Sequence, residues 1–364
     1  LDDAARHSFL RRPAVADDAA IREAVLEIVA DVKNGGDDTL RVLTARLDGA
    51  ELADLRVSGE EMDAASASLS PAAIDAIDVA ITNVRRFHEA QRPPDVNVET
   101  MPGVRCERVS RAIDAVGLYV PAGTAPLPSA AVMLAVPAVI AGCATRIVCT
   151  PPRPDGRADP AVVVAAARAG ISDIFKIGGA QAIAAMAYGT ASVPKVGKIF
   201  GPGNAWVTCA KSAVSSDPEG AAIDMPAGPS EVLVIADESA SAEFVASDLL
   251  SQAEHGVDSQ VVLVTTSVQL ADSVEEQLEQ QLRSLSRADI ARGSLEHARI
   301  VIVDDVETAV EVSNRYAPEH LILQCDDARG LLPAIINAGS VFVGQWTPES
   351  VGDYCSGTNH VLPT

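Results

Sequence analysis

Beyond residue 112 the chain alternates between short apolar runs and longer segments whose apolar residues recur at helical spacing. Strands that alternate with helices predict βα units, which assemble into mainly parallel sheets covered by helices on both faces. Nine runs exceed one ordinary sheet, so we predict an α/β fold with two doubly wound, mainly parallel sheets. The predicted strands are Ala115–Val120, Arg146–Cys149, Asp173–Ile177, Lys198–Phe200, Val232–Ile235, Val261–Thr265, Ile300–Val303, Leu321–Leu323 and Ser340–Val343.

The first 110 residues show a helical pattern instead. Apolar residues from Ile21 to Val32 share one helical face, and Gly35 and Gly36 are expected to stop that helix. Ser70 followed by Pro71 is typical of a helix start. We therefore predict three parts: an N-terminal helical region over residues 1–110, one sheet domain over 111–235 and a second over 236–364.

The charge balance limits the partners of this protein. Among 364 residues, 28 Lys and Arg stand against 50 Asp and Glu, which gives a net charge of -22. Such a surface repels phosphate groups, which argues against nucleic acid and against an anionic membrane as partners. The longest apolar stretch, Ala130–Ala144, is too short for a membrane span and contains Pro137. The N-terminus lacks the apolar segment of a signal peptide, so we expect a cytoplasmic protein.

Three glycine-rich loops follow predicted strands of the first sheet. They are Pro121–Pro128, Gly178–Gln181 and Gly201–Asn204. In doubly wound sheets ligands bind outside the carboxyl ends of the strands. Glycine has no side chain, so a ligand can come close to the backbone there, and the N-termini of helices attract anions. One such loop is usually only a turn, but three in one half predict a binding edge for an anion or a dinucleotide, although the G-x-G-x-x-G fingerprint is absent.

The second half contributes side chains suited to metal and acid–base chemistry. Gln252 and His255 are three residues apart, so a helix places both on one face, within reach of one ion. Glu319 and His320 are adjacent at the entrance of a predicted strand, and Asp353 lies in a polar final segment. Each alone is more often structural, but together they offer nitrogen and oxygen ligands and a spare pair for proton transfer. A metal-dependent hydrolase would use the same set without needing the glycine-rich loops.

Seven long motifs place these residues in a family context. In order along the chain, they resemble those of the histidinol dehydrogenase family, from about residue 20 to the end, and motifs of this length are very specific. The motifs are GLYVPAGTAPLPS (Gly117–Ser129), KIGGAQAIAAMAYGT (Lys176–Thr190), KIFGPGNAWV (Lys198–Val207), IDMPAGPSEVLVIAD (Ile223–Asp237), DLLSQAEHG (Asp248–Gly256), NRYAPEHL (Asn314–Leu321) and GSVFVGQWTPESVGDYCSGTNHVLPT (Gly339–Thr364).

The resemblance implies a reaction and a set of site residues. It implies a zinc- and NAD-dependent homodimer, with two incomplete Rossmann-like halves, that oxidises L-histidinol to L-histidine through L-histidinal in two hydride transfers. It assigns NAD binding to residues 111–235 and metal and catalysis to residues 236–364, the half on which we expect the helical region to pack. The implied residues are Gln252, His255 and Asp353 as zinc ligands, Glu319 and His320 as the acid–base pair, Ser230, Gln252, His255, His320 and Asp353 around the substrate, and Tyr119, Gln181 and Asn204 in the NAD site.

The sequence departs from the family pattern at its end. The family continues beyond GTNHVLPT with a segment that carries a further histidine ligand and a glutamate, and this segment reaches the partner's active site in the dimer. The given sequence ends at Thr364, and His360 is expected to be a nearby or structural residue, not a substitute ligand. Two alternatives stay open: an NAD-dependent dehydrogenase of another amino or sulfonated alcohol, and a truncated, catalytically incomplete form that only binds NAD.

Overall fold

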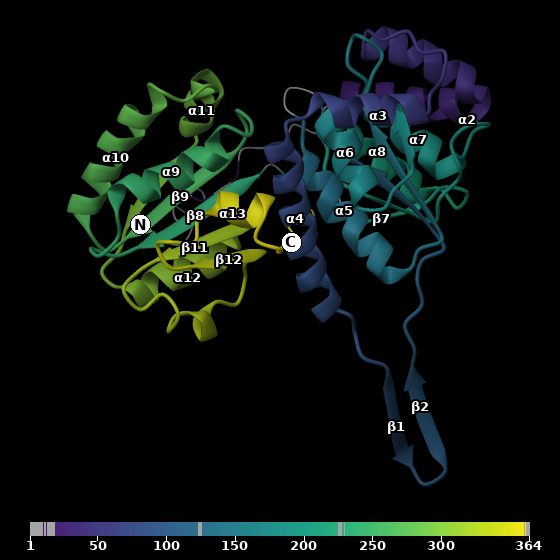
Figure 1. The fold of residues 1–364 in the computed structure, drawn as a ribbon. Coiled ribbons are helices and arrows are strands. Elements are labelled where there is room, and N and C mark those ends of the chain that lie inside the picture. Colours follow the sequence, from purple (N-terminus) through teal and green to yellow (C-terminus); the bar gives the residue numbers. More distant parts are fainter. Residues whose placement is uncertain are drawn as a thin grey trace. The chain divides into compact units, whose positions relative to one another are not determined.

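The computed structural model describes residues 10, 12, 19–122, 126–224, 228, 230–359 and 361. These residues form two compact units, and each unit contains a five-stranded parallel sheet (Figure 1). The first unit comprises Asp18–Ala227 and Tyr354–Leu362, and the second comprises Gly228–Asp353 together with Leu10 and Arg12. The predicted α/β fold with two mainly parallel sheets is confirmed, and all nine predicted strands are present.

The sheet of the first unit has the strand order β5-β4-β3-β6-β7. The first of these strands in the chain, β3, is central, so the winding direction reverses between β3 and β6 and creates a switch point at their carboxyl ends. The elements are β3 (Ala115–Tyr119), α5 (Pro128–Ala141), β4 (Thr145–Thr150), α6 (Pro160–Arg168), β5 (Asp173–Lys176), α7 (Gly179–Tyr188), β6 (Lys198–Phe200), α8 (Ala205–Ser216) and β7 (Ala222–Ile223).

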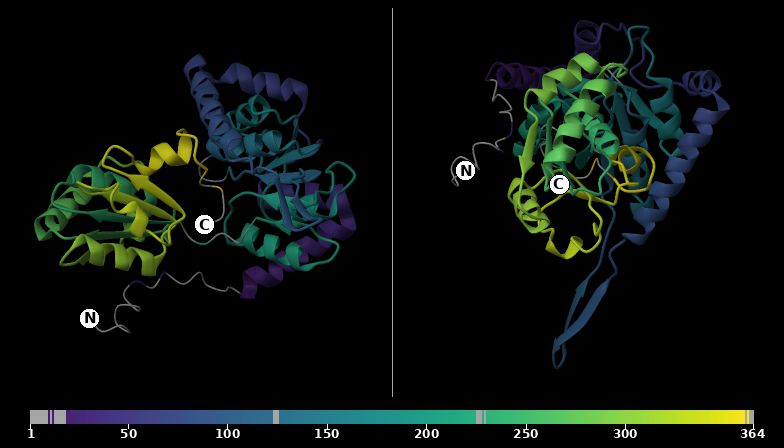
Figure 2. Two further views of the ribbon diagram at one scale, coloured as in Figure 1. Left: turned by 90° about the horizontal axis from the view of Figure 1, so that it is seen from below. Right: turned by 90° about the vertical axis from the view of Figure 1, so that its left-hand side faces the viewer.

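The N-terminal helices cover this first sheet. Helix α2 (Ala19–Leu47) packs with α7 and α8 on one face, and α3 (Gly59–Ser68) and α4 (Pro71–Ala90) pack with α5 and α6 on the other (Figure 2). The expectation that the helical region packs on the half with the predicted metal ligands is therefore wrong. The physical reason is that a parallel sheet buries both faces, and the apolar stripes of α2 and α4 complete the two cores of the first sheet.

Local residues determine an interruption in α2 and the start of α4. Gly36 adopts a left-handed φ of 58° that interrupts α2, as expected, but the helix resumes and continues to Leu47. Helix α4 starts as predicted, with the Ser70 side chain accepting the Ala73 N–H and Pro71 in the first turn. No single described helix is long and apolar enough to cross a membrane, and α3 and α4, bent by 109°, meet those criteria only as a pair.

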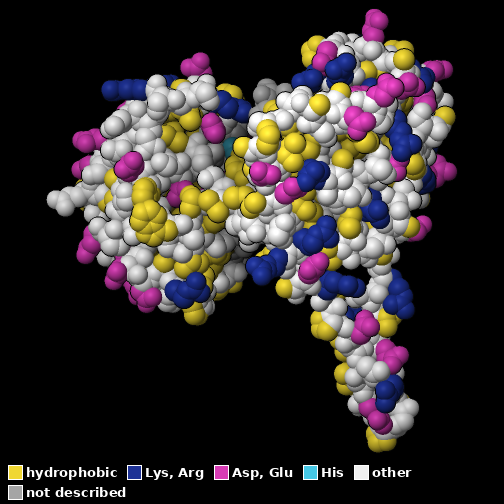
Figure 3. Space-filling view, in the orientation of Figure 1, with side chains coloured by type: hydrophobic (Ala, Val, Ile, Leu, Met, Phe, Trp, Pro, Cys, Tyr) yellow, Lys and Arg dark blue, Asp and Glu magenta, His cyan; other side chains and the backbone are white. Residues whose placement is uncertain are grey.

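An antiparallel hairpin interrupts the region that we predicted to be helical. It consists of β1 (Val96–Met101) and β2 (Val104–Arg108), and every residue of both strands is exposed. Basic, acidic and hydrophobic side chains all lie on its surface (Figure 3). The alternation in these strands is too short to stand out in the sequence, and the hairpin contributes nothing to the buried cores.

The second unit repeats the topology of the first, with the strand order β10-β9-β8-β11-β12. Helices α9, α10 and α11 cover one face and α12 the other. The predicted domain boundary at 235/236 is too late, because β8 pairs with β9 and β11 and lies at the centre of the second sheet. The elements are β8 (Glu231–Ala236), α9 (Ala242–Ala253), β9 (Gln260–Thr265), α10 (Val268–Leu282), α11 (Ala288–Leu295), β10 (Arg299–Ile302), α12 (Val306–Tyr316), β11 (His320–Gln324), η1 (Leu332–Ala334), β12 (Ser340–Val343) and α13 (Glu349–Tyr354).

The substitution Leu40→Ala tests the packing of α2 on the first sheet. Leu40 is 0% exposed in the core of the first unit, so its truncation is expected to lower the free energy of unfolding by about 2–5 kcal/mol. Val42→Ala is the control in the same helix, because Val42 is 65% exposed. It is expected to cost less than about 0.5 kcal/mol. Urea unfolding measures both variants, and equal losses would contradict the observed packing.

Candidate functional site

The glycine-rich loops meet at the carboxyl edge of the first sheet. Tyr119 is the last residue of β3, Gln181 lies in the first turn of α7, and Asn204 caps α8. Gly201 has a φ of 129°, and an added Cβ would lie 2.1 Å from the Tyr119 carbonyl oxygen, so only glycine fits there. The structure thus brings the three predicted NAD residues to one edge, while residues 123–125 of the first loop lie outside the described residues.

Each of these three residues also has a structural partner. The Tyr119 hydroxyl accepts the Gly179 N–H at 3.0 Å, and the Gln181 amide donates to Asp48 Oδ2 at 3.2 Å. Asn204 accepts two backbone N–H groups of the helix that it caps. Tyr119 and Gln181 are buried, whereas Asn204 is exposed. Burial raises the pKa of Tyr119 to about 12, so its hydroxyl remains protonated at neutral pH.

A buried ion pair that the sequence did not reveal supports the third loop. Lys211 Nζ donates to the Gly201 carbonyl at 2.9 Å and forms an ion pair with Asp224. The second oxygen of Asp224 accepts the Gly201 N–H at 2.8 Å. The pair therefore fixes the peptide groups on both sides of Gly201. The only signal in the sequence was one lysine in the middle of an amphipathic helix, a position that is usually exposed.

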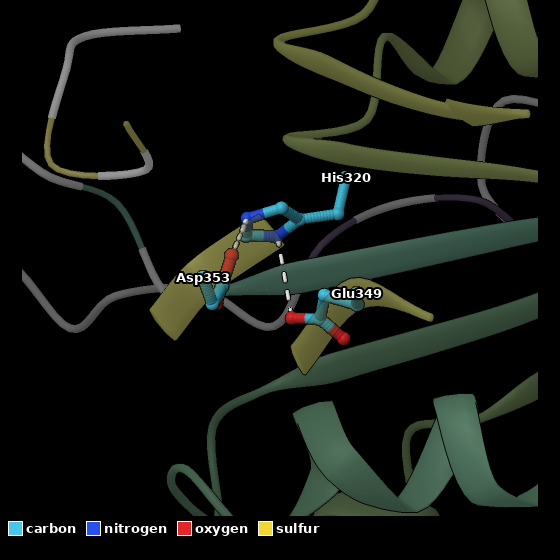
Figure 4. A group of neighbouring side chains, drawn as sticks. All are labelled: His320, Glu349 and Asp353. Carbon is cyan, nitrogen blue, oxygen red and sulfur yellow. Dashed lines mark ion pairs between the residues drawn. The ribbon is translucent and has the colours of Figure 1, made fainter. Parts of the chain in front are cut away.

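In the second unit, one imidazole lies between two carboxylates (Figure 4). His320 Nε2 lies 3.4 Å from Asp353 Oδ1, and His320 Nδ1 lies 3.7 Å from Glu349 Oε1. The exposed fractions of His320, Glu349 and Asp353 are 3%, 1% and 4%. Their potential ligand atoms all lie within 4.8 Å of one another, and no other His, Cys, Asp or Glu group in the described part of the chain is arranged to hold a metal ion.

Two short elements position this cluster. His320 opens β11, and Glu349 and Asp353 lie four residues apart on one face of α13. Glu319 precedes His320 at the strand entrance, as predicted, and its Oε2 lies 3.8 Å from His320 Nδ1. Ser230 directly precedes β8 at the same amino edge of the sheet. Sequence reasoning missed Glu349, although its spacing from Asp353 was an available signal.

The last turn of α9 leads to the remaining predicted ligands. Ser251 Oγ donates to Glu349 Oε2 at 2.8 Å, which joins this turn to the cluster. The next residue, Gln252, is 0% exposed, and among the described residues neither atom of its amide has a hydrogen-bond partner. A buried amide of this kind costs free energy unless a ligand satisfies it. His255 is exposed, and its N–H donates to the Gln252 carbonyl at 3.1 Å. His360 lies outside the described residues.

The electrostatics of the cluster favour an added positive charge. Burial by itself lowers the pKa of His320, but Asp353, Glu349 and Glu319 outweigh it and raise that pKa to about 9. Burial raises the pKa of Glu349 to about 8, and it also raises the pKa of Glu319. Although part of the His255 side chain is exposed, the protein atoms around its ring desolvate it and lower the pKa of His255, with Asp353 acting in the opposite direction. These raised carboxyl pKa values mean that Glu349 and Glu319 resist ionisation in this buried site, and a further cation close by would favour their ionised forms.

Nitrogen and oxygen donors of this kind suit a divalent cation such as zinc. The orphaned amide of Gln252 and the charge of the cluster fit the ligand set that the sequence predicts. The fold and the cluster together define an α/β protein of two parallel-sheet units with a candidate metal site in the second unit.

Comparison with known proteins identifies the family. The family model of histidinol dehydrogenase matches residues 10–364. The histidinol dehydrogenases of Vibrio cholerae and Xanthomonas oryzae are each 56% identical to this chain over 364 residues, which is 100% of this chain and 84% of each relative. The crystal structure of histidinol dehydrogenase from Elizabethkingia anophelis has a TM-score of 0.96 and 46% identity, covering 100% of this chain and 83% of that chain. The chain therefore belongs to the histidinol dehydrogenase family.

The same comparisons bear on the alternatives left open by the sequence. The matches to enzymes named histidinol dehydrogenase span the whole of this chain, so they support a dehydrogenase. Membership of this family makes the protein an oxidoreductase, and this finding argues against the metal-dependent hydrolase.

The substitution Asp48→Asn tests the buried carboxyl group beside Gln181. Burial raises the pKa of Asp48 from 3.8 to about 6, although the Gln181 hydrogen bond opposes the shift. Because the folded state binds this proton more tightly than the unfolded state, ionisation of Asp48 costs stability as the pH rises through about 4 to 6. The free energy of unfolding of the variant is expected to exceed that of the parent by about 1–2 kcal/mol at pH 7.5, and this difference is expected to disappear near pH 4. Thermal unfolding at both pH values measures this, and a gap independent of pH would contradict the interpretation.

Proposed function

We propose that this protein oxidises L-histidinol to L-histidine through L-histidinal, with NAD as hydride acceptor and one zinc ion per subunit. The observation that carries the proposal is the buried cluster of His320, Glu349 and Asp353 in a chain of the histidinol dehydrogenase family. The names of the relatives supply the substrate, and the nitrogen and oxygen donors of the second unit supply the metal chemistry.

The proposed zinc ligands of this chain are Gln252, His255 and Asp353. Gln252 supports this choice most directly, because its amide is buried without a partner in the described part of the chain. Bound zinc would supply a Lewis acid for the substrate, and bound NAD would supply the acceptor for hydride. The residues proposed to surround the substrate are Ser230, Gln252, His255, His320 and Asp353.

His320 is the proposed base of the first oxidation. Its Nδ1 lies 3.1 Å from the Glu231 carbonyl oxygen, which can only accept, so Nδ1 carries a hydrogen and Nε2 is the atom that takes a proton. The hydroxyl of histidinol loses its proton to Nε2 while the carbinol carbon loses a hydride, and the product is the aldehyde. Asp353, Glu349 and Glu319 raise the pKa of His320. A cation or a proton that neutralises these carboxylates would lower that pKa and favour the neutral ring, which can accept a proton.

Glu319 is the proposed base of the second oxidation. Its carboxyl group is half-buried beside His320, and burial raises its pKa, which makes the carboxylate a stronger base. A water molecule loses a proton to Glu319 as its oxygen adds to the aldehyde carbon, and the resulting hydrate loses the second hydride. One histidinol, one water and two NAD+ thus give one histidine with its carboxylate ionised, two NADH and three protons. Retention of the aldehyde between the steps protects a reactive intermediate.

The proposed NAD site consists of Tyr119, Gln181 and Asn204. Their position at the carboxyl edge of a doubly wound sheet, beside the switch point between β3 and β6, supports this assignment. The homodimer and the cytoplasmic location stay predictions from the sequence.

The stoichiometry of the reaction tests the proposed function. NADH absorbance is followed with L-histidinol, NAD and added zinc, and two NADH are expected for each histidinol consumed. Glu319→Gln is expected to lower this ratio toward one, because hydration of the aldehyde then lacks its base. A single NADH per histidinol in the parent would contradict the four-electron oxidation. Faster oxidation of another amino or sulfonated alcohol, with histidinol only competing, would favour the related dehydrogenase.

The substitution Gln252→Leu tests the metal site with a readout that does not depend on catalysis. An apolar side chain of similar length replaces the unpartnered buried amide, so the metal-free protein is expected to gain about 1–3 kcal/mol of stability. The same change removes a proposed ligand, so zinc affinity is expected to fall at least about tenfold. Thermal unfolding in chelator measures the first effect and elemental analysis the second.

Gln280→Leu is the matched control for this variant. Gln280 lies at an exposed position of α10, and its substitution is expected to leave zinc content unchanged and to add no comparable stability. A Gln252→Leu variant that retains zinc as tightly as this control would contradict the proposed ligand set.

A further inference from the structure

One residue outside the metal cluster contacts both proposed bases, one through its buried carboxylate and the other through its backbone carbonyl. Glu231 opens β8 and is 7% exposed. Its Oε1 accepts the Glu319 N–H at 3.2 Å, and its own N–H donates to Glu319 Oε2 at 3.3 Å. Its carbonyl oxygen accepts from His320 Nδ1 at 3.1 Å. Glu231 thus holds the backbone and carboxylate of Glu319 and fixes which nitrogen of His320 carries the hydrogen.

Arg12 balances the charge of this carboxylate through a two-pronged contact. Arg12 Nε lies 2.6 Å from Glu231 Oε2, and Arg12 Nη2 lies 2.7 Å from Glu231 Oε1. Such bidentate pairs fix geometry as well as charge. Without the guanidinium, the carboxylates of Glu231 and Glu319 would repel each other in a partly buried site.

The same guanidinium binds the turn between α12 and β11. Arg12 Nη2 donates to the carbonyls of Tyr316 and Ala317 at 2.8 and 3.1 Å, and the guanidinium lies 4.5 Å from the centroid of the Tyr316 ring. The Tyr316 hydroxyl donates to Glu231 Oε2 at 2.9 Å. Three of the contacts that hold this turn therefore come from one arginine.

This turn needs external support. Ala317 has a φ of 55° and is the one non-glycine residue with a positive φ in the described ranges of the chain. An alanine in the left-handed region is strained, and such strain persists only when surrounding contacts hold it. Glu319 and His320 follow two and three residues later, so the conformation of Ala317 sets where both side chains start.

We propose that Arg12 and Glu231 are positioning residues, which hold Glu319 and His320 in their working orientation through the Tyr316–His320 turn. The effect on rate rests on the proposed function, whereas the effect on the turn rests on the contacts alone. Among the described residues, the hydrogen bonds, ion pair and ring contact of Arg12 go to Glu231, Tyr316 and Ala317, and none of these three is proposed to bind zinc, substrate or NAD. The loss of Arg12 is therefore expected to lower kcat more than it raises KM.

Arg12→Ala in the full chain tests this inference, with Lys33→Ala as the matched control. Lys33 has the same kinds of contact in the first unit, with ion pairs to Asp217 and Glu219 at 3.0 and 2.8 Å and a position 4.5 Å from the Tyr188 ring centroid. Arg12→Ala is expected to lower kcat about tenfold or more, with KM for histidinol changed less than about threefold. Lys33→Ala is expected to stay within about twofold of the parent in both constants.

A second readout reports on the turn without any turnover. The backbone amides of Glu231 and Glu319 are hydrogen-bonded to each other's carboxylates. Residue-resolved hydrogen exchange at these two amides is expected to accelerate about tenfold or more in Arg12→Ala and to stay unchanged in Lys33→Ala. Arg12→Lys keeps the positive charge but loses the bidentate contact with Glu231, so it is expected to accelerate exchange at the two amides less than Arg12→Ala does.

The two readouts separate the inference from the proposed function. If the parent does not oxidise histidinol, the proposed function fails, and amide exchange alone decides the role of Arg12. Parent-like exchange and kcat in Arg12→Ala would overturn the inference. If Arg12→Ala does not fold, the same parent-like result in Arg12→Lys would overturn it.

Discussion

Buried negative charge requires a compensating positive charge or a proton, and the polar sites within each unit show this constraint. Glu349 and Asp353 approach one imidazole in a site where each side chain is almost fully buried. Two carboxylates cannot both stay ionised there unless a cation is near, because Coulomb repulsion is weakly screened in a low-dielectric interior. His320 supplies part of this compensation, and the proposed zinc ion would supply further positive charge.

Elsewhere the protein meets the same constraint with its own side chains or with protons. Arg12 balances Glu231 in the second unit, and Lys211 balances Asp224 in the first. Asp48 and Asp248 are paired instead with neutral glutamine amides, and burial raises the pKa of each to about 6. The carboxylates that are paired with a cation hold neighbouring backbone N–H groups in place. The two that are paired with amides have pKa values closer to neutrality than a free carboxyl group.

The two sheets share one strand order but present different edges for chemistry. In the first unit the glycine-rich loops lie at the carboxyl edge, where helix N-termini favour anions. In the second unit the titratable side chains lie at the amino edge, where β8 and β11 begin side by side. Parallel pairing aligns His320 with Val232 and so brings His320 beside Glu231. The rule that ligands bind at carboxyl ends therefore describes only the first sheet.

The sequence by itself determined the features that depend on neighbouring residues. All nine predicted strands were present, because a strand buried on both faces needs a continuous apolar run. The start of α4 at Ser70 and Pro71 and the place of Glu319 and His320 at a strand entrance are local in the same sense. Tertiary structure decided the packing of α2 to α4 on the first sheet, the position of the domain boundary, and the roles of Arg12, Glu231 and Glu349. Arg12 and Glu231 are 219 positions apart, and nothing in either local sequence marks the pair. The energy of a charged group depends on burial and on distant partners, and only the folded chain fixes those two quantities.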